Sequence, residues 1–256
     1  MYKIDVLVQG YPGRSVCNGG LGWSTTTLLR DSQHSILVDV GAFGVRHFLE
    51  QQLKNCGVSP EDITDVVLTH AHYDHAVNFT LFPNATVWIG ADELSWAAAQ
   101  PPGFNPLPEL YVRELAVSPK VRRLADGETF LPGMTAIASP GHTPGHLLFH
   151  VDLPGQAILF TGDAAKNRAE LLSLSANDTY DAQTSKASLE LIWDIWKRIP
   201  DTLLVPGHDL SMKLDESGQP FYLGKRLAAI NAWFGDTLEP TRIDLCCGGR
   251  SARQSA

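Results

Sequence analysis

A histidine cluster behind a strand-like segment constrains this sequence more than any other feature. The string HAHYDH follows residues 63–68, an apolar run that we predict to be a buried strand, and places three imidazoles and one carboxylate within six positions. His70 and His72 are two residues apart, so on an extended backbone their side chains point the same way. Asp74 and His75 are adjacent and must diverge, so this one loop can supply ligands to two metal centres. Imidazole and carboxylate groups suit zinc, and also iron or manganese.

Three further motifs place histidine or aspartate at the ends of strand-like runs. They are PGHTPGH at residues 140–146, FTGDA at residues 160–164 and VPGHD at residues 205–209. Each contains glycine, which lets the backbone turn sharply or approach a neighbour closely. Ligands at several strand ends converge at one edge of a sheet, and six of the nine histidines fall in the four motifs. We interpret the other three, His34, His47 and His150, as ordinary core or surface residues.

The pattern of apolar residues predicts alternating strands and helices. Strands are predicted over residues 3–9, 24–29, 35–40, 63–68, 86–89, 134–138, 146–152, 157–160 and 203–205. Helices are predicted over residues 45–56, 92–100, 182–198 and 221–234, and a proline-containing loop over residues 103–120. This order favours a layered α/β fold in which sheets pack together and helices lie outside them.

Composition predicts an ordinary globular protein with one large domain. Hydrophobic residues make up 44% of the 256 residues and charged residues 19%. We expect a single domain over residues 1–247 and a mobile polar tail over residues 248–256. No apolar segment suits a signal peptide or a membrane helix, so we expect a cytoplasmic protein without membrane contact. The cysteines are too few and too scattered for a disulfide framework, and we interpret the adjacent Cys246 and Cys247 as free thiols.

The four motifs together resemble the signature of the metallo-β-lactamase superfamily. His-x-His-x-Asp-His is the most specific part, residues 38–41 (VDVG) are similar to the first motif, and the match spans about residues 24–209. The resemblance implies an α/β fold of four layers, the αββα sandwich, with the site at one edge between two sheets. It implies two metal sites with a shared ligand: the first on His70, His72 and His142, the second on Asp74, His75 and His208, with Asp163 bridging. Asp39 and His146 would orient these ligands without binding metal.

Such a ligand set implies hydrolysis by two divalent metal ions. Zinc is the favoured metal, and iron or manganese are the alternatives. Two metals roughly 3.5–4 Å apart can bind one water and lower its pKa towards ~7. The metal-bound hydroxide then attacks a carbonyl or phosphoryl centre, and Asp74 can take up a proton.

We predict that the substrate is a small-molecule lactone or ester. The layout of residues 163–208, with NDTY before an amphipathic helix, is similar to that of the acyl-homoserine lactonases. One alternative is a thioesterase of the glyoxalase II type, in which Lys166 and Arg168 hold an anionic substrate tail. The other is an endoribonuclease or phosphodiesterase. Against it stand the net charge of −8 and the mere 44 residues between Asp163 and His208, which leave no room for a large inserted domain.

Candidate substrate-binding residues lie in loops close to the motifs. Aromatic side chains there would suit a substrate with an acyl or ring group. The candidates are Trp23, Tyr73, Phe104, Lys166 and Tyr180. We expect no nucleic-acid partner, because the only dense basic cluster is Lys120, Arg122 and Arg123, and we leave a homodimer open.

Overall fold

The computed structural model describes residues 2–16, 19–199 and 201–246 and divides the chain into two compact units. Met1–Leu223 form the first unit and Gly224–Ala256 the second, and each is described by itself. The sequence had led us to expect one domain over residues 1–247. The tail predicted over residues 248–256 lies outside the described residues, as do Cys17 and Cys247.

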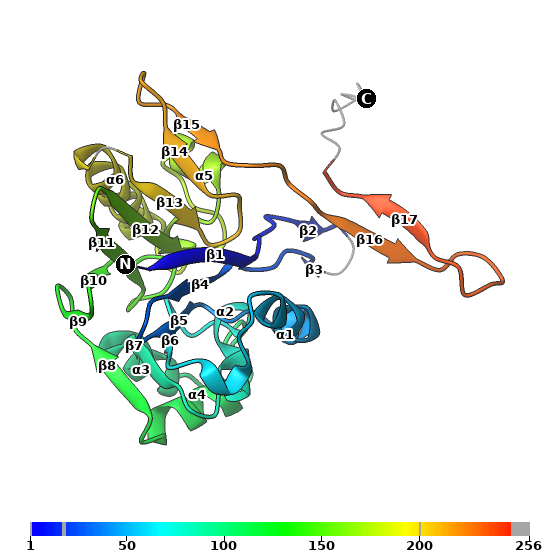
Figure 1. Cartoon of the computed structure of the whole chain (residues 1–256), viewed down its shortest axis with the longest axis horizontal. Coiled ribbons are helices and arrows are strands. Elements are labelled where there is room, and N and C mark those ends of the chain that lie inside the picture. Colours follow the sequence, from blue (N-terminus) through cyan, green and yellow to red (C-terminus); the bar gives the residue numbers. More distant parts are fainter. Residues whose placement is uncertain (1, 17–18, 200, 247–256) are drawn as a thin grey trace. The chain divides into compact units, whose positions relative to one another are not determined.

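Two sheets form the centre of the first unit (Figure 1). The six-stranded sheet runs in the order β1 (Lys3–Val8), β4 (Thr26–Arg30), β5 (Ser35–Val38), β6 (Asp65–Val67), β7 (Thr86–Gly90) and β8 (Val121–Leu124). The seven-stranded sheet runs in the order β15 (Pro220–Tyr222), β14 (Met212–Leu214), β13 (Leu203–Pro206), β12 (Gln156–Gly162), β11 (Leu147–Leu153), β10 (Met134–Ala138) and β9 (Thr129–Leu131). The pairs from β5 to β8 are parallel, as is the β12–β13 pair. Parallel strands bring their carboxyl ends to one edge, and three of the four motifs lie at the ends of such strands. The motif at residues 140–146 follows β10, which pairs antiparallel with β9 and β11.

Alternating side chains of the strands build a core on both faces of each sheet. In β4, Leu28 packs with the helices beside the six-stranded sheet, while Leu29 packs between the sheets. In β12, Phe160 packs between the sheets and Leu159 faces the helices beside the seven-stranded sheet. Because successive side chains on a strand point to opposite faces, these short apolar runs suit strands buried on both sides.

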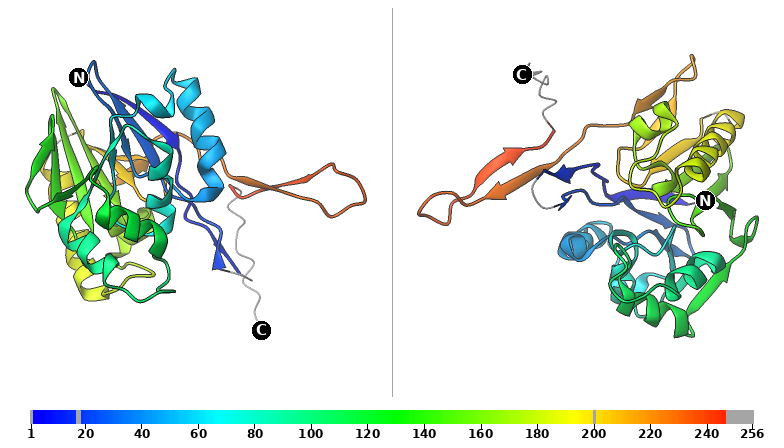
Figure 2. Two further views of the ribbon diagram at one scale, coloured as in Figure 1. Left: turned by 90° about the horizontal axis from the view of Figure 1, so that it is seen from below. Right: turned by 180° about the vertical axis from the view of Figure 1, so that it is seen from behind.

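Helices cover the two outer faces of the sheets. The α-helices are α1 (Arg46–Asn55), α2 (Tyr73–Ala76), α3 (Ala91–Ala98), α4 (Glu109–Val117), α5 (Arg168–Ser173) and α6 (Ala182–Arg198). Short 3-10 turns are η1 (Phe43–Val45), η2 (Pro60–Asp62), η3 (Val77–Leu81) and η4 (Asp163–Ala165). Helices α1, α3 and α4 lie on one side of the strands and α5 and α6 on the other, as Figure 1 and the right view of Figure 2 show. The four-layer αββα sandwich is therefore confirmed.

Helix α6 forms where the sequence predicts it. Its N-cap is Asp181, whose carboxylate accepts a hydrogen bond of 2.6 Å from the backbone N–H of Thr184. Leu189, Ile192 and Trp196 recur at helical spacing and are buried on one face. This face closes the core outside β12 and β13. The helix itself lies in the connection from the end of β12 to the start of β13.

Two of the predicted elements are wrong. The loop predicted over residues 103–120 contains α4, because Pro108 directly precedes that helix, where a proline is tolerated, and Val112 and Leu115 are buried. The helix predicted over residues 221–234 is instead divided between β15 and β16 (Ala229–Ala232). Apolar residues of this segment recur three and four positions apart, but only residues 221–222 and 229–232 lie in strands, and residues 223–228 form neither helix nor strand.

The second unit contains a two-stranded hairpin of β16 and β17 (Thr241–Asp244). Ile230 pairs with Ile243 on one face and Asn231 with Arg242 on the other. The Cys246 thiol accepts a hydrogen bond of 2.8 Å from the backbone N–H of Ala228, and Cys246 is a free cysteine. None of the helices in the described part of the chain is long and apolar enough to cross a membrane.

Candidate metal centre

The HAHYDH segment runs from the carboxyl end of β6 into α2. His72 still has an extended backbone, with φ −64° and ψ 151°, and α2 begins at the next residue. Asp74 and His75 therefore lie on a helical turn, about 100° apart, and point to different places. His70, His72 and His75 are buried, while the Asp74 side chain keeps 19% of its surface exposed.

The remaining candidate ligands follow other strands. His142 lies in the loop between β10 and β11, Asp163 directly follows β12, and His208 follows β13. Gly162 makes the turn before Asp163 with φ 46°, and a Cβ atom there would come within 2.7 Å of the Thr69 side chain. A Cβ atom at Gly207 would come within 2.3 Å of the Asp163 carboxylate. Both turns therefore need glycine to bring the ligands together.

The structure brings all seven predicted ligands together at one edge of the two sheets. Their ligand atoms form overlapping groups in which every atom lies within 4.8 Å of the others. The groups are His70, His72 and His142; His70, His75 and Asp163; and Asp74, His75 and His208. These His and Asp groups are able to bind metal.

Asp163 stands between the two outer groups and directs one oxygen to each. Its Oδ2 lies 3.3 Å from His142 Nε2. Its Oδ1 lies 3.1 Å from His75 Nε2 and 3.2 Å from His208 Nε2. A carboxylate with its oxygens divided in this way has the geometry of a bridging ligand.

Facing ring nitrogens indicate that a cation fits this site. His142 Nε2 lies 2.9 Å from His72 Nδ1, and His75 Nε2 lies 3.3 Å from His208 Nε2. His70 Nε2 is buried and has no hydrogen-bond partner among the described residues. Two imidazole nitrogens can lie this close only if they share a proton or a metal ion, and nitrogen with carboxylate oxygen is a donor set that zinc accepts.

The surroundings shift the pKa values of the histidines in the two outer groups in opposite directions. Burial lowers the pKa of His70 and of His142 well below the ordinary value, and lowers the pKa of His72 to about 4. These three rings are therefore neutral and offer lone pairs. Burial also opposes a proton on His75, but the carboxylates of Asp163, Asp39 and Asp74 raise its pKa well above the ordinary value. Positive charge is thus favoured beside the carboxylates.

Asp39 and His146 make the contacts that orienting residues require. The Asp39 carboxylate accepts hydrogen bonds from the Thr69 backbone N–H at 2.9 Å and lies 2.8 Å from His75 Nδ1. His146 Nε2 accepts a hydrogen bond of 3.0 Å from the Asp163 backbone N–H, and its Nδ1 lies 2.8 Å from Ser139 Oγ. Each residue thereby holds a turn that carries a candidate ligand, and neither residue belongs to the three groups of candidate ligands.

Glu93 is a buried residue of the site that the sequence analysis missed. It lies in the first turn of α3, with 0% of its surface exposed. Burial raises its pKa to about 7, against the lowering effect of hydrogen bonds from Thr143, Ala71 and Gly145. No sequence signal marks it, because a glutamate in the first turn of a helix is ordinary.

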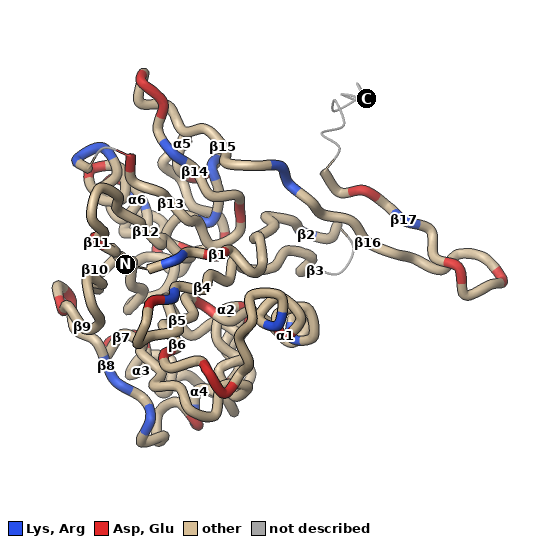
Figure 3. The backbone as a smooth tube through the Cα atoms, viewed as in Figure 1, with Lys and Arg blue, Asp and Glu red and all other residues tan. Residues whose placement is uncertain are grey.

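A cavity of about 1000 Å³ opens beside the candidate ligands. Its inner wall carries His72, Asp74, His142, Asp163 and His208. Its volume is at the upper end of the range of small-molecule sites. The basic cluster at residues 120–123 lies at β8, which Figure 3 shows in blue, and does not line this cavity.

Aromatic residues form part of the outer wall of the cavity. Phe104 and Tyr180 line it together with Trp96, whose ring centre lies 5.9 Å from each of theirs. Tyr73 also lines it and is 41% exposed. Trp23 is not among the lining residues of the described chain; Tyr11 is, and it stacks on Trp23 with the ring centres 4.9 Å apart.

Lys166 lines the cavity close to the metal-ligand candidates. Its Nζ donates hydrogen bonds to Glu170 Oε1 at 3.2 Å and to the Asn177 carbonyl at 2.7 Å. The pKa of His72 is lowered mainly by burial, and the charge of Lys166 lowers it further. Arg14 also lines the cavity and forms an ion pair with Asp178. The cavity therefore combines aromatic surface with cations.

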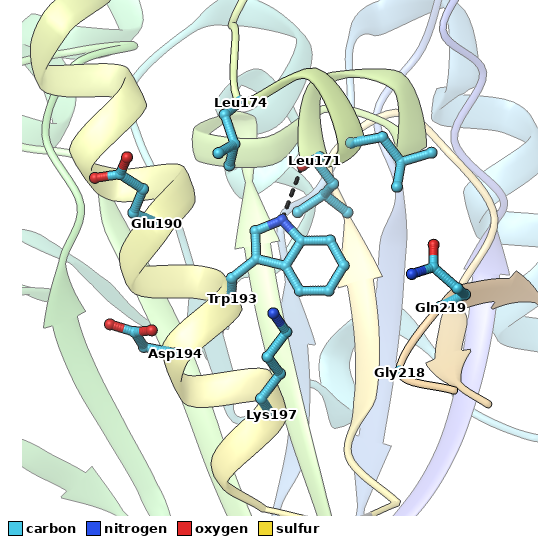
Figure 4. A pocket seen from close by; sticks show the side chains of 9 residues that line it. Leu171, Leu174, Glu190, Trp193, Asp194, Lys197, Gly218 and Gln219 are labelled. Atoms are coloured by element: carbon cyan, nitrogen blue, oxygen red, sulfur yellow. Dashed lines mark hydrogen bonds between the residues drawn. The ribbon is translucent and has the colours of Figure 1, made fainter. Parts of the chain in front are cut away.

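A second cavity, of about 350 Å³, lies between α5, α6 and the β14–β15 turn (Figure 4). Trp193 forms its floor, and its indole N–H donates to the Leu171 carbonyl at 2.8 Å. Lys197 lies over the Trp193 ring, 4.7 Å from its centre. This cavity contains none of the candidate ligands among its lining residues, so it is separate from the metal centre.

An αββα body with histidines and aspartates at one edge defines a class of metal-dependent hydrolases. A sequence model of the metallo-beta-lactamase superfamily matches residues 19–208, and the chain belongs to this superfamily. It is 26% identical to metallo-beta-lactamase domain-containing protein 1 of Xenopus laevis over 223 residues, which cover 85% of this chain and 84% of that protein.

Lactonases are among its other relatives. The chain is 27% identical to an N-acyl homoserine lactonase of a Bacillus species over 165 residues, 63% of this chain and 62% of the lactonase, which is less than two thirds of that enzyme. The structure of AidC, a dizinc quorum-quenching lactonase, superposes with a TM-score of 0.65 at 20% identity, covering 79% of this chain and 80% of that chain. At this identity the superposition shows the shared fold alone.

Proposed function

We propose that this hydrolase opens a small-molecule lactone or ester with two divalent metal ions, zinc in preference to iron or manganese. The observation that carries the proposal is the divided Asp163 carboxylate, whose Oδ1 faces His75 and His208 while its Oδ2 faces His142. The first ion would be held by His70, His72 and His142, and the second by Asp74, His75 and His208.

The chemistry divides between the metals and the chain. Two bound metals supply a nucleophilic water of lowered pKa and a Lewis acid for the carbonyl oxygen. Asp74 takes up the proton of the attacking water and returns it to the leaving alkoxide. Its Oδ2 lies 3.4 Å from His208 Nε2, and its side chain is partly exposed to the cavity. Because the proton lost by the water is the proton that the alkoxide gains, one carboxylate suffices for both transfers.

The outer cavity fits an acyl or ring group. Trp96, Phe104 and Tyr180 offer apolar faces that can cover such a group. The relatives named as N-acyl homoserine lactonases support a substrate that combines a lactone with an acyl chain. A small neutral substrate also needs no basic surface, which agrees with the net charge of −8.

A thioesterase is a second candidate, because Lys166 and Arg14 line the cavity. Both are already paired with chain carboxylates, Lys166 with Glu170 and Arg14 with Asp178. An anionic substrate tail would have to compete with the carboxylates of these ion pairs. We therefore place the thioesterase after the lactonase. An endoribonuclease is third, since a run of phosphates calls for a broader basic surface.

A hydrolysis panel tests the proposal. Protein loaded with zinc is assayed against lactones of increasing acyl length, simple esters, thioesters and single-stranded RNA. We expect turnover of a lactone or ester that is lost in His70→Ala and His72→Ala. The control His47→Ala replaces an exposed histidine on α1 and should leave turnover unchanged. RNA cleavage that depends on His70 and His72, without any ester hydrolysis, would reject the lactonase proposal in favour of a nuclease.

Metal content tests the dinuclear part of the proposal separately. Elemental analysis of purified protein should give close to two metal ions per chain, because both outer ligand groups are complete. A single ion that is unaffected by His208→Ala would contradict the second site.

A further inference from the structure

Glu93 joins the two loops that carry the first metal group. One carboxylate oxygen, Oε1, accepts a hydrogen bond of 2.9 Å from the backbone N–H of Ala71, which lies between His70 and His72. The other, Oε2, accepts one of 2.6 Å from Thr143 Oγ1, next to His142. The backbone N–H of Gly145 also donates to the carboxylate. A single side chain therefore spans the histidine loop after β6 and the loop between β10 and β11.

The loops also lie directly against the helix that carries Glu93. A Cβ atom at Gly145 would come within 2.0 Å of the Glu93 backbone nitrogen. A Cβ atom at Gly90, just before α3, would come within 2.8 Å of the Gly145 carbonyl. The start of α3 is thus a fixed support on which the second loop rests.

Burial of this carboxylate is costly, and no cationic side chain in the described part of the chain offsets the cost. Among the described residues, Glu93 forms no ion pair with lysine, arginine or histidine, although it is fully buried. A buried acid without a cationic partner costs stability unless hydrogen bonds compensate for the lost water. Here all the compensating donors come from the two ligand loops. An apolar side chain would fill the same space without that cost, so the acid points to a role in the site.

Within the first metal group, the His142 ring lacks the usual means of orientation, whereas His70 Nδ1 lies 3.0 Å from Thr69 Oγ1. A metal-binding histidine normally donates its second ring N–H to a carboxylate or carbonyl, as His75 does to Asp39. His142 Nδ1 is buried and has no hydrogen-bond partner among the described residues. The position of this ring therefore depends on the backbone of its loop, and Glu93 holds that backbone.

We infer that Glu93 is a positioning residue that fixes the distance between His72 and His142 and so sets the metal affinity of the first group. The second group, on Asp74, His75 and His208, does not depend on it, because Asp39 orients His75. The inference rests on the metal binding of the proposed function and not on the identity of the substrate.

Zinc affinity of Glu93→Met and Glu93→Gln, measured by competition with a chelator, tests the inference. Methionine is similar in size but accepts no hydrogen bond from Ala71 or Thr143. We expect one of the two zinc ions to bind about 10- to 100-fold more weakly, as for other residues behind metal ligands, while the other keeps its affinity. Glutamine should restore most of the affinity, because its carbonyl can accept from Ala71 and its amide can donate to the Thr143 hydroxyl. The matched control is Asp92→Asn, an exposed acid in the same helical turn, which should bind both ions as wild type does.

Two further measurements separate positioning from general stability. Thermal unfolding of the metal-free variants reports the fold, and the visible absorption of cobalt-loaded protein reports the ligand geometry of each site. If Glu93→Met does not fold, Thr143→Val takes its place, since it removes only the contact to Oε2. Unchanged affinity for both ions in a folded variant would overturn the inference, as would an equal loss at both sites. A wild-type chain that binds no zinc would instead reject the metal centre itself.

Discussion

His146 should stabilise the metal-free protein only while its imidazole is neutral. Burial lowers its pKa from 6.5 to about 3, and its Nε2 accepts the Asp163 N–H, so the folded ring has no place for a second proton. The unfolded chain takes up that proton below pH 6.5. The stabilisation is therefore complete above pH 6.5 and is lost as the pH falls towards 3. Linkage makes the loss about 2 kcal/mol between pH 7 and pH 5.

His146→Gln isolates this effect, because glutamine can accept the Asp163 N–H but does not titrate. The variant loses the contact to Ser139, which costs about 1 kcal/mol at pH 7. Urea unfolding of both metal-free proteins at pH 7, 6 and 5 gives the difference in the free energy of unfolding. We expect wild type to be the more stable at pH 7 and the order to be equal or reversed at pH 5. A difference that stays constant, or grows as the pH falls, would refute a neutral His146.

Three more perturbations follow from the geometry of the site. Asp163→Ala should reduce the amount of bound metal and lower turnover at least about 100-fold, with little unfolding. Elemental analysis and a thermal melt check this, and full turnover would show that the chemistry takes place elsewhere. Gly162→Ala should destabilise the protein by about 1–3 kcal/mol, because its φ is 46° and its Cβ would meet Thr69; an unchanged urea midpoint would contradict this. Tyr180→Ala should raise KM for a long acyl substrate and leave kcat nearly unchanged, because the exposed ring only covers the substrate. A fall in kcat at constant KM would argue against binding of the acyl chain by this aromatic side of the cavity.

Sequence reasoning located the candidate ligands because their positions depend on local features. His70 and His72 follow a buried strand, and Asp163 and His208 follow glycine at the ends of two parallel strands. A strand that ends at glycine and a metal-binding side chain can be recognised from a few adjacent residues of the sequence. The convergence of several such ends then follows from the topology, because parallel strands share one carboxyl edge.

The same reasoning failed where the pattern of apolar residues was ambiguous. Leu223, Leu227, Ile230 and Phe234 recur at helical spacing, but the segment forms no helix, and of these four residues Ile230 lies in a strand, β16. Pairing of Ile230 with Ile243 depends on a strand beyond the turn, which a local window does not include. Tertiary pairing overrides local periodicity when the two disagree.

The supporting residues of the site were harder to predict than the ligands, and for a physical reason. A ligand must be histidine, aspartate or another donor, so its identity reports its role. Glu93 acts through the backbone of Ala71 and the hydroxyl of Thr143, and neither partner carries a sequence signature. Asp39 could be found only because it lies beside a recognisable turn. Residues that position ligands through backbone contacts can therefore be identified only from a structure in which the loops are placed together. A search for them should begin with buried charged side chains that lack a partner of opposite charge.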